Sequence, residues 1–101
     1  MNRDRAIRRV RIRGRVQGIG FRVWTEREAL SRALEGWVRN RGDGSVEAVF
    51  AGREDAVEAV IKACHTGPPG ARVEDVDVEE GMADVLQERP KNTRFAVLPT
   101  A

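Results

Sequence analysis

Hydrophobic and polar residues alternate over residues 6–13, which predicts a half-buried β-strand. The alternation puts Ala6, Val10 and Ile12 on one face, together with Arg8. The opposite face carries Ile7, Arg9, Arg11 and Arg13. We therefore expect one side of this strand to face the core and the other side to be strongly basic.

The hydrophobic period changes after this strand, and from about Phe21 to Leu34 it is that of an amphipathic helix. The apolar arc of this helix consists of Val23, Ala29, Leu30, Ala33 and Leu34. Glu26 also falls on the arc, whereas Trp24 falls outside it. We expect the arc to pack against the rest of the molecule and Trp24 to point elsewhere.

The remaining chain predicts a hairpin, a second helix and two more strands. The hairpin joins residues 37–40 to a strand marked by Val46, Ala48 and Phe50, across a glycine-rich turn at residues 41–44. The second helix follows Arg53 and ends at residues 66–70, and its apolar face is formed by Val57, Val60, Ile61 and Cys64. A strand around Val76 and Val78, an irregular loop over residues 80–93 and a short strand over residues 94–98 follow.

The element order is β-α-β-β-α-β with a short fifth strand, which predicts a ferredoxin-like α+β sandwich. In that fold one antiparallel sheet carries two helices on one face, and the first and third strands lie at its centre. We expect residues 1–101 to form a single domain, since no linker or repeat interrupts the pattern. The pattern does not place the fifth strand.

The charge of the chain is unevenly distributed along its length. Residues 1–41 hold twelve arginines and four acidic residues, whereas residues 42–101 hold six basic and twelve acidic ones, for a net charge of +2. A basic half is able to attract an anionic substrate or a nucleic acid. The single cysteine and the absence of a long apolar run predict a cytoplasmic protein without a membrane span.

The stretch Gly14-Arg15-Val16-Gln17-Gly18-Ile19-Gly20-Phe21-Arg22 joins the first strand to the first helix. A glycine-rich turn at this place can direct several backbone N–H groups into one concavity, at the positive end of the helix dipole. Arg22 then lies in the first helical turn, where its planar guanidinium can contact two oxygens of a phosphate. The pattern indicates an anion cradle, although the glycine spacing alone fits a plain turn equally well.

The topology brings a second polar residue to the same edge of the sheet. The first two strands of a β-α-β unit run parallel, so the glycine-rich turn and Asn40 both follow carboxyl ends of strands. With one strand between them, their separation is roughly 10 Å, which suits a phosphate ester and one water. An asparagine side chain can orient a water but has no useful basicity. Taken alone, Asn40 fits a turn-initiating residue better than a catalytic one.

Two long motifs resemble the acylphosphatase family. Residues 14–22 match its signature G-x-V-Q-G-V-x-F-R, with Ile19 in place of a valine, and residues 36–47 match G-W-V-R-N-x-x-D-G-x-V-E. Residues 67–73 are similar to the loop before the family's fourth strand. The main departure precedes the second motif, where Arg32-Ala33-Leu34-Glu35 replaces the usual Leu-Gly-Leu-x.

This resemblance implies a hydrolase that cleaves the carboxyl–phosphate bond of small-molecule acyl phosphates without a metal or cofactor. It further implies that Arg22 and Asn40 are catalytic. Phosphate binding would fall to the backbone N–H groups of Val16, Gln17, Gly18, Ile19, Gly20 and Phe21, together with Arg22. Asn40 would hold the attacking water, and a phosphate oxygen of the substrate would accept its proton.

Other reactive residue types fit structural roles. We expect His65 to cap the second helix, Cys64 to be a buried side chain, and Asp43 to stabilise its turn. Trp37 and Phe50 are expected in the core, and no spacing of His, Cys or carboxylates predicts a metal site.

Two other functions remain possible from the residues alone. Ferredoxin-like sheets also bind RNA, but such sheets expose aromatic residues on their central strands, and the first strand here has none. We therefore expect no nucleic-acid partner. A domain of a larger carbamoyl-transfer protein is the other alternative. The chain shows no zinc-finger cysteines, so a free-standing monomeric enzyme is the preferred interpretation.

Overall fold

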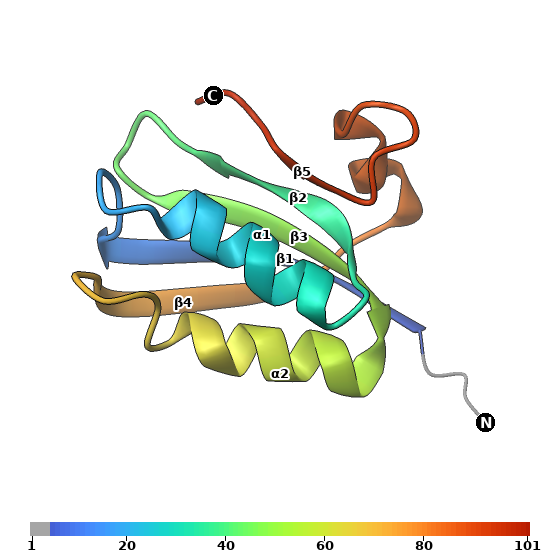
Figure 1. Ribbon diagram of the computed structural model, residues 1–101, viewed down its shortest axis with the longest axis horizontal. Helices are drawn as coiled ribbons and strands as arrows, with labels where there is room; N and C mark the ends of the chain where they lie inside the picture. The colour runs from blue at the N-terminus through green and yellow to red at the C-terminus, as the bar shows by residue number, and fades with distance from the viewer. Residues whose placement is uncertain (1–4) are drawn as a thin grey trace.

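The computed structural model describes residues 5–101 and confirms the predicted order of elements (Figure 1). The elements are β1 (Arg5–Arg15), α1 (Phe21–Ser31), β2 (Glu35–Asn40), β3 (Val46–Arg53), α2 (Glu54–Cys64), β4 (Arg72–Glu80), the 3₁₀ helix η1 (Ala83–Glu88) and β5 (Phe95–Val97). The expectation of an irregular loop over residues 80–93 was wrong in part, because η1 lies within it.

The five strands form one sheet in the order β4-β1-β3-β2-β5. Within the four-stranded unit β1 and β3 are interior, as predicted, and their pairing with each other and with β4 and β2 is antiparallel. The fifth strand, which the sequence did not place, runs parallel to the outer edge of β2, with Gly36 opposite Phe95. Both helices cover the same face of the sheet (Figure 1).

The main core lies between this face and the two helices. Its largest buried side chains include Phe21 and Phe50, and Phe50 stacks on Phe95 with 5.8 Å between ring centroids. Burying one such side chain contributes about 1.5–3 kcal/mol. The face of α2 is as predicted, since Val57, Val60 and Cys64 are buried.

A second, smaller core lies on the opposite face of the sheet. It consists of Trp37, Val49, Ala51, Leu86 and Ala96, and the segment containing η1 covers it. The indole Nε1 of Trp37 donates a hydrogen bond of 2.7 Å to the carbonyl oxygen of Val85. Trp37 is thus a core residue as predicted, but it packs under η1 and not under the two long helices.

The rest of this second face is polar and is organised around a buried carboxylate. Glu47 of β3 is only 2% exposed, and its oxygens lie 3.1 Å from Arg9 Nε, 2.9 Å from Arg39 Nε and 3.1 Å from an Arg41 amino group. Arg13 of β1 likewise pairs with Asp77 of β4. Arginines of the first half of the chain are therefore neutralised by acidic residues of the second half.

The predicted apolar arc of α1 was wrong in part, because Ala29 and Leu34 are buried but other members of the arc are exposed. The helix ends at Ser31, its buried residues are Phe21, Thr25 and Ala29, and Trp24 packs partly against the core. Val23 and Leu30, which were expected inside, are 48% and 44% exposed. The polar Thr25 is tolerated in the core because its hydroxyl donates a 2.8 Å hydrogen bond to the carbonyl oxygen of Phe21.

A left-handed residue ends α1 one turn earlier than the hydrophobic period suggested. Ala33 has φ of +59°, its N–H donates to Leu30 O at 3.0 Å, and the N–H of Leu34 donates to Ala29 O at 2.9 Å. This pair of bonds is the Schellman arrangement that usually places glycine in the left-handed position. Leu34 is buried, but it lies beyond the end of α1, so the helical period does not explain its burial.

Two further observations complete the fold. No helix among residues 5–101 combines the length and the apolar character that a bilayer crossing requires. His65 is the C-terminal cap residue of α2, as predicted, and its Nδ1 lies 3.1 Å from the carbonyl oxygen of Ile61.

Candidate active site

The loop from β1 to α1 exposes its backbone through two left-handed glycines. Gly18 has φ of +79° and Gly20 has φ of +83°, a region that glycine enters without the steric penalty of a Cβ atom. A Cβ added at either position would meet no atom within 4 Å, so conformation and not crowding selects glycine here. The backbone therefore faces open space at these two glycines.

The N-terminus of α1 carries no compensating group of its own. Gly20 is the N-cap and offers no side-chain cap, and the first turn of α1 contains no acidic residue. The first intrahelical bond runs from Trp24 N to Gly20 O, so the helix geometry leaves the N–H groups of residues 21–23 without intrahelical partners. These groups and the positive end of the helix dipole suit an anion from outside the helix.

Arg22 and Asn40 meet this helix end in one small hollow. The hollow has a volume of about 110 Å³ and is lined by Val16, Gly18, Gly20, Phe21, Arg22, Val23 and Asn40. Both Arg22 and Asn40 are half-buried. At about 30 Å³ per liquid water, the volume equals about three to four waters, which is the scale of one phosphate group.

Strand register explains why these two residues meet. Val46 of β3 pairs with Asn40 of β2 on one side and with Ile12 of β1 on the other. Asn40 is therefore level with Ile12, three residues before β1 ends at Arg15 and the glycine loop begins. The sequence-based expectation that one strand separates the loop from Asn40 is confirmed.

Gln17 and Ile19, which were expected among the phosphate-binding residues, do not line the hollow. The side-chain amide of Gln17 instead donates hydrogen bonds to the carbonyl oxygens of Arg41, at 2.9 Å, and Ser45, at 2.8 Å. These bonds join the glycine loop to the turn that directly follows Asn40. The sequence analysis missed this link, since it considered only the backbone of Gln17.

The turn after Asn40 is held by further bonds. Asp43 accepts hydrogen bonds from the backbone N–H of Ser45, at 3.0 Å, and from its hydroxyl, at 2.6 Å. These bonds from Ser45 lower the pKa of the Asp43 carboxyl below its ordinary value, so the carboxylate stays charged in its structural position. The backbone carbonyl of Asn40 also accepts a 3.0 Å bond from the N–H of Ala101.

The other reactive residues lie apart from the hollow. Cys64 is fully buried, and burial raises the pKa of its thiol to about 12, so it is a poor nucleophile at neutral pH. Among residues 5–101, no three side chains of His, Cys, Asp or Glu are grouped so as to hold a metal ion.

Comparison with known proteins places this geometry in a family. The sequence profile described as "Acylphosphatase" matches residues 8–97. An acylphosphatase of Bradyrhizobium diazoefficiens is 53% identical over 97 residues, which make up 96% of this chain and 98% of that protein.

Two solved structures of the same name share the fold. An acylphosphatase from Coxiella burnetii is 30% identical with a TM-score of 0.82, and the match covers 97% of this chain and all of the other. The acylphosphatase from Bacillus subtilis is 37% identical with a TM-score of 0.79, over 91% and 97% of the two chains. With a profile over most of its length and a relative identical at more than half of the aligned positions, this chain belongs to the acylphosphatase family.

Proposed function

We propose that this protein is an acylphosphatase that hydrolyses acyl phosphates to a carboxylate and inorganic phosphate. In this reaction water attacks phosphorus, the bond between phosphorus and the acyl oxygen breaks, and the carboxylate leaves. A carboxylate is a stable leaving group, so the step needs no general acid. The observation that carries the proposal is the hollow that joins the glycine loop, Arg22 and Asn40.

The phosphoryl group is assigned to the loop and the helix end. Its charge in the transition state lies on the three non-bridging oxygens, where preorganised donors are most effective. The backbone N–H groups of the loop residues that line the hollow, together with the first turn of α1, supply such donors. Arg22 adds a bidentate, permanently charged partner for two of these oxygens.

The attacking water is assigned to Asn40. Its amide offers two donors and one acceptor, which orient a water but do not remove its proton. A non-bridging phosphate oxygen of the substrate then accepts that proton as the new bond forms. Asn40 lies on β2 while the phosphate donors lie after β1, so the nucleophile and the phosphoryl group are held by different elements.

We further infer that residues 1–101 act as a single-domain monomer on a small molecule. Both parts of the hollow come from one chain, and its volume of about 110 Å³ fits one phosphate group. An RNA-binding role is disfavoured because the face of the sheet away from the long helices is occupied by Arg–Glu pairs around Glu47 and by η1. The buried free thiol of Cys64 fits a reducing, cytoplasmic compartment.

The test is phosphate release from acetyl phosphate and benzoyl phosphate by the purified protein, in a buffer with a strong chelator. We expect hydrolysis by the wild type and a kcat about 10²-fold or more lower for Asn40→Ala, with inhibition by free phosphate nearly unchanged. Asn92→Ala, on the loop before β5, is the matched control and should keep wild-type turnover. The proposal would be contradicted if the wild type did not hydrolyse either substrate. The assignment of Asn40 would be contradicted if Asn40→Ala lost inhibition by free phosphate in parallel with kcat.

A further inference from the structure

A second and much larger cavity lies at the other end of β2. It has a volume of about 870 Å³ and lies between the first residues of β1 and β2 and the segment 83–94. Glu35, the first residue of β2, lines it, whereas Asn40, the last residue of that strand, lines the active-site hollow. The two linings share no residue, and a six-residue strand spans roughly 17–20 Å.

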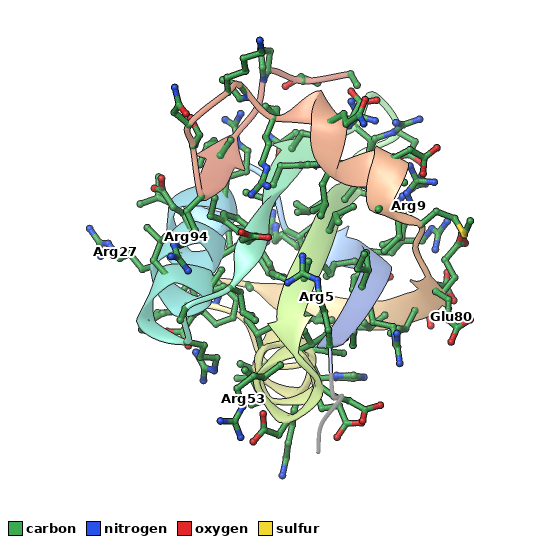
Figure 2. The ribbon with its side chains drawn as sticks, turned by 90° about the vertical axis from the view of Figure 1, so that its right-hand side faces the viewer. Arg5, Arg9, Arg27, Arg53, Glu80 and Arg94 are labelled. Carbon is green, nitrogen blue, oxygen red and sulfur yellow. The ribbon has the colours of Figure 1, made fainter. Side chains whose placement is uncertain are left out.

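The ionisable side chains of this space are mainly cationic, and we call it the basic cavity. Arg5, Arg89, Lys91 and Arg94 line it against the single carboxylate of Glu35, a net charge of +3. Figure 2 looks onto this end of the molecule, with Arg5 and Arg94 on the side facing the viewer, below the segment that contains η1. The cations come from two parts of the chain, the start of β1 and residues 89–94, and the fold brings these parts together.

Two of the arginines are held in place by backbone carbonyls. One amino group of Arg89 donates a 2.6 Å hydrogen bond to Arg94 O, and one amino group of Arg94 donates a 3.2 Å bond to Ala33 O. The second amino group of Arg89 lies 3.9 Å from Glu35 Oε1. Each guanidinium carries five N–H donors, so both groups have further donors for a ligand. Because both side chains are already partly fixed, ligand binding removes less of their conformational entropy.

The direction of the pKa shift of Glu35 indicates that the electrostatic potential in the basic cavity is positive. Its pKa is lowered, and the largest cause is the hydrogen bond from Arg5, at 3.0 Å. Burial, the next largest effect, raises the pKa, and the positive charges of Arg89, Arg5 and Arg94 lower it further. One carboxylate is thus stabilised by three guanidinium groups. The cavity retains excess positive charge after this pairing, which a second anionic partner can neutralise.

The same cavity also has an apolar part. Leu86, Ala83 and Pro90 line it beside the cations. A volume within about 300–1,000 Å³ is typical of small-molecule sites, and a mixed lining suits a ligand with both an anionic and an apolar part. The space is an open groove, and its cations and apolar residues lie close enough for one small molecule to contact both.

We propose that the basic cavity binds a small phosphorylated molecule that has at least two negative charges and an apolar or aromatic body, such as a nucleoside di- or triphosphate. The phosphates contact Arg89, Arg94 and Lys91, and the body lies against Leu86 and Pro90. This site is separate from the glycine loop and does not depend on the function proposed above.

Calorimetric titration of the Arg22→Ala variant with ATP and with pyrophosphate tests the proposal at constant ionic strength. Arg22→Ala weakens the anion site of the glycine loop, so any remaining binding reports the basic cavity. We expect one binding site for each ligand, and ATP should bind more tightly than pyrophosphate. Lys91→Glu in the same background should weaken ATP binding about tenfold or more, since it reverses a charge inside the cavity. Lys62→Glu makes the same change in net charge on exposed α2, outside the cavity, and should change the affinity less than twofold.

The outcomes separate this proposal from the proposed function. No heat with millimolar ATP, or equal weakening by Lys91→Glu and Lys62→Glu, overturns the basic cavity whatever the hydrolysis assay gives. Pyrophosphate binding as tightly as ATP overturns the assignment of the apolar part. Lys91→Glu in the wild-type background should hydrolyse acyl phosphates normally, so loss of ATP binding with retained turnover supports a second, independent site.

Discussion

Arg22 occupies a position that is unfavourable for a cation unless an anion accompanies it. It lies in the first turn of α1, where the helix dipole is positive and no acidic residue balances it. Arg22→Lys keeps the charge but loses the planar two-point contact with phosphate oxygens, so we expect kcat/KM to fall about 10²-fold or more. Steady-state kinetics with benzoyl phosphate measures the change.

The matched control is Arg27→Lys, in the same helix and exposed, which should leave kcat/KM unchanged. Near-normal turnover by Arg22→Lys would show that only the charge matters in the hollow.

Gln17 is a positioning residue in this interpretation, because its amide joins the glycine loop to the turn after Asn40. Gln17→Glu places a carboxylate against two carbonyl oxygens and removes both bonds. We expect kcat to fall about tenfold or more through displacement of Asn40, since misplacement by about 1 Å can lower rates about 10²-fold. The inhibition constant of free phosphate, which depends on the loop and Arg22, should change much less.

Gln87→Glu, on exposed η1, makes the same chemical change away from the hollow and should leave kcat unaltered. If kcat and phosphate inhibition changed by the same factor in Gln17→Glu while the protein stayed folded, Gln17 would support the fold only.

Those parts of the site whose position depends only on the topology of the fold could be predicted from the sequence. The β-α-β crossover and the glycine loop place Arg22 and Asn40 at one edge, and both line the hollow. The direction of the Gln17 side chain was not predictable, because its acceptors lie 24 and 28 residues further along the chain. Local patterns carry no information about such a contact, which depends on how two loops meet.

At the scale of elements, the end of α1 stores a small strain. Ala33 adopts φ of +59° at the position of the Schellman arrangement that glycine usually occupies. A left-handed L-residue costs about 1–2 kcal/mol, and part of this is offset because glycine gains entropy in the unfolded chain. Ala33→Gly should therefore raise the free energy of unfolding by about 0.5–1 kcal/mol, or several degrees in Tm for a domain of this size.

The comparison for this prediction is Ala59→Gly, on the exposed side of α2. Glycine within a helix costs about 1 kcal/mol relative to alanine, so this variant should be destabilised. Urea unfolding of both variants measures the change in the free energy of unfolding, which should be positive for Ala33→Gly and negative for Ala59→Gly. Destabilisation by Ala33→Gly would mean that the left-handed conformation carries no penalty here.

The elements that sequence patterns misjudged share a cause. The apolar arc of α1 was misplaced because Thr25, a polar residue, is buried through a hydrogen bond to its own helix, whereas Val23 and Leu30 are exposed. Residues 80–93 show no clear period, and η1 lies over the second core that includes Trp37. Tertiary contacts decide both, while α2 and the central strands, with strong periodic patterns, were predicted correctly.

At the scale of the whole molecule, the two halves of the sequence balance each other electrically. The basic first half supplies Arg9, Arg39 and Arg41, and the acidic second half supplies Glu47, which all three contact. Removing one arginine should cost less than the roughly 3–5 kcal/mol that is typical of a fully buried pair, because two arginines remain and the side chains of Arg9 and Arg41 are 37% and 34% exposed. The charge asymmetry along the sequence therefore stabilises the face of the sheet opposite the long helices.

The buried thiol gives the folding equilibrium a defined dependence on alkaline pH. The pKa of Cys64 rises from 9.0 to about 12 on folding, so the folded state keeps the proton while the unfolded state loses it above pH 9. The contribution of the Cys64 thiol to the free energy of unfolding is fully present below pH 9, and it is lost between pH 9 and about 12. At pH 10 the wild type should have lost about 1.4 kcal/mol from this group relative to pH 7.

Urea unfolding of the wild type and of Cys64→Ala at pH 7 and pH 10 measures this loss. Cys64→Ala is destabilised at both pH values, because removal of the thiol leaves a small cavity. Its free energy of unfolding should not show the additional decrease between pH 7 and pH 10 that we expect for the wild type. An equal decrease in both proteins would show that the thiol is not desolvated.

The two tryptophans of the sequence lie on opposite faces of the sheet, which has an optical consequence. Trp24 of α1 meets the ring of Phe21 edge-on, with 5.3 Å between centroids, beside the glycine loop. Trp37 lies in a cluster with Leu86, which also lines the basic cavity. Indole emission responds to the polarity near the ring, so single-tryptophan variants made with phenylalanine distinguish the two sites by fluorescence. Phosphate bound at the loop should alter the emission of Trp24, and a nucleotide bound in the basic cavity should alter that of Trp37.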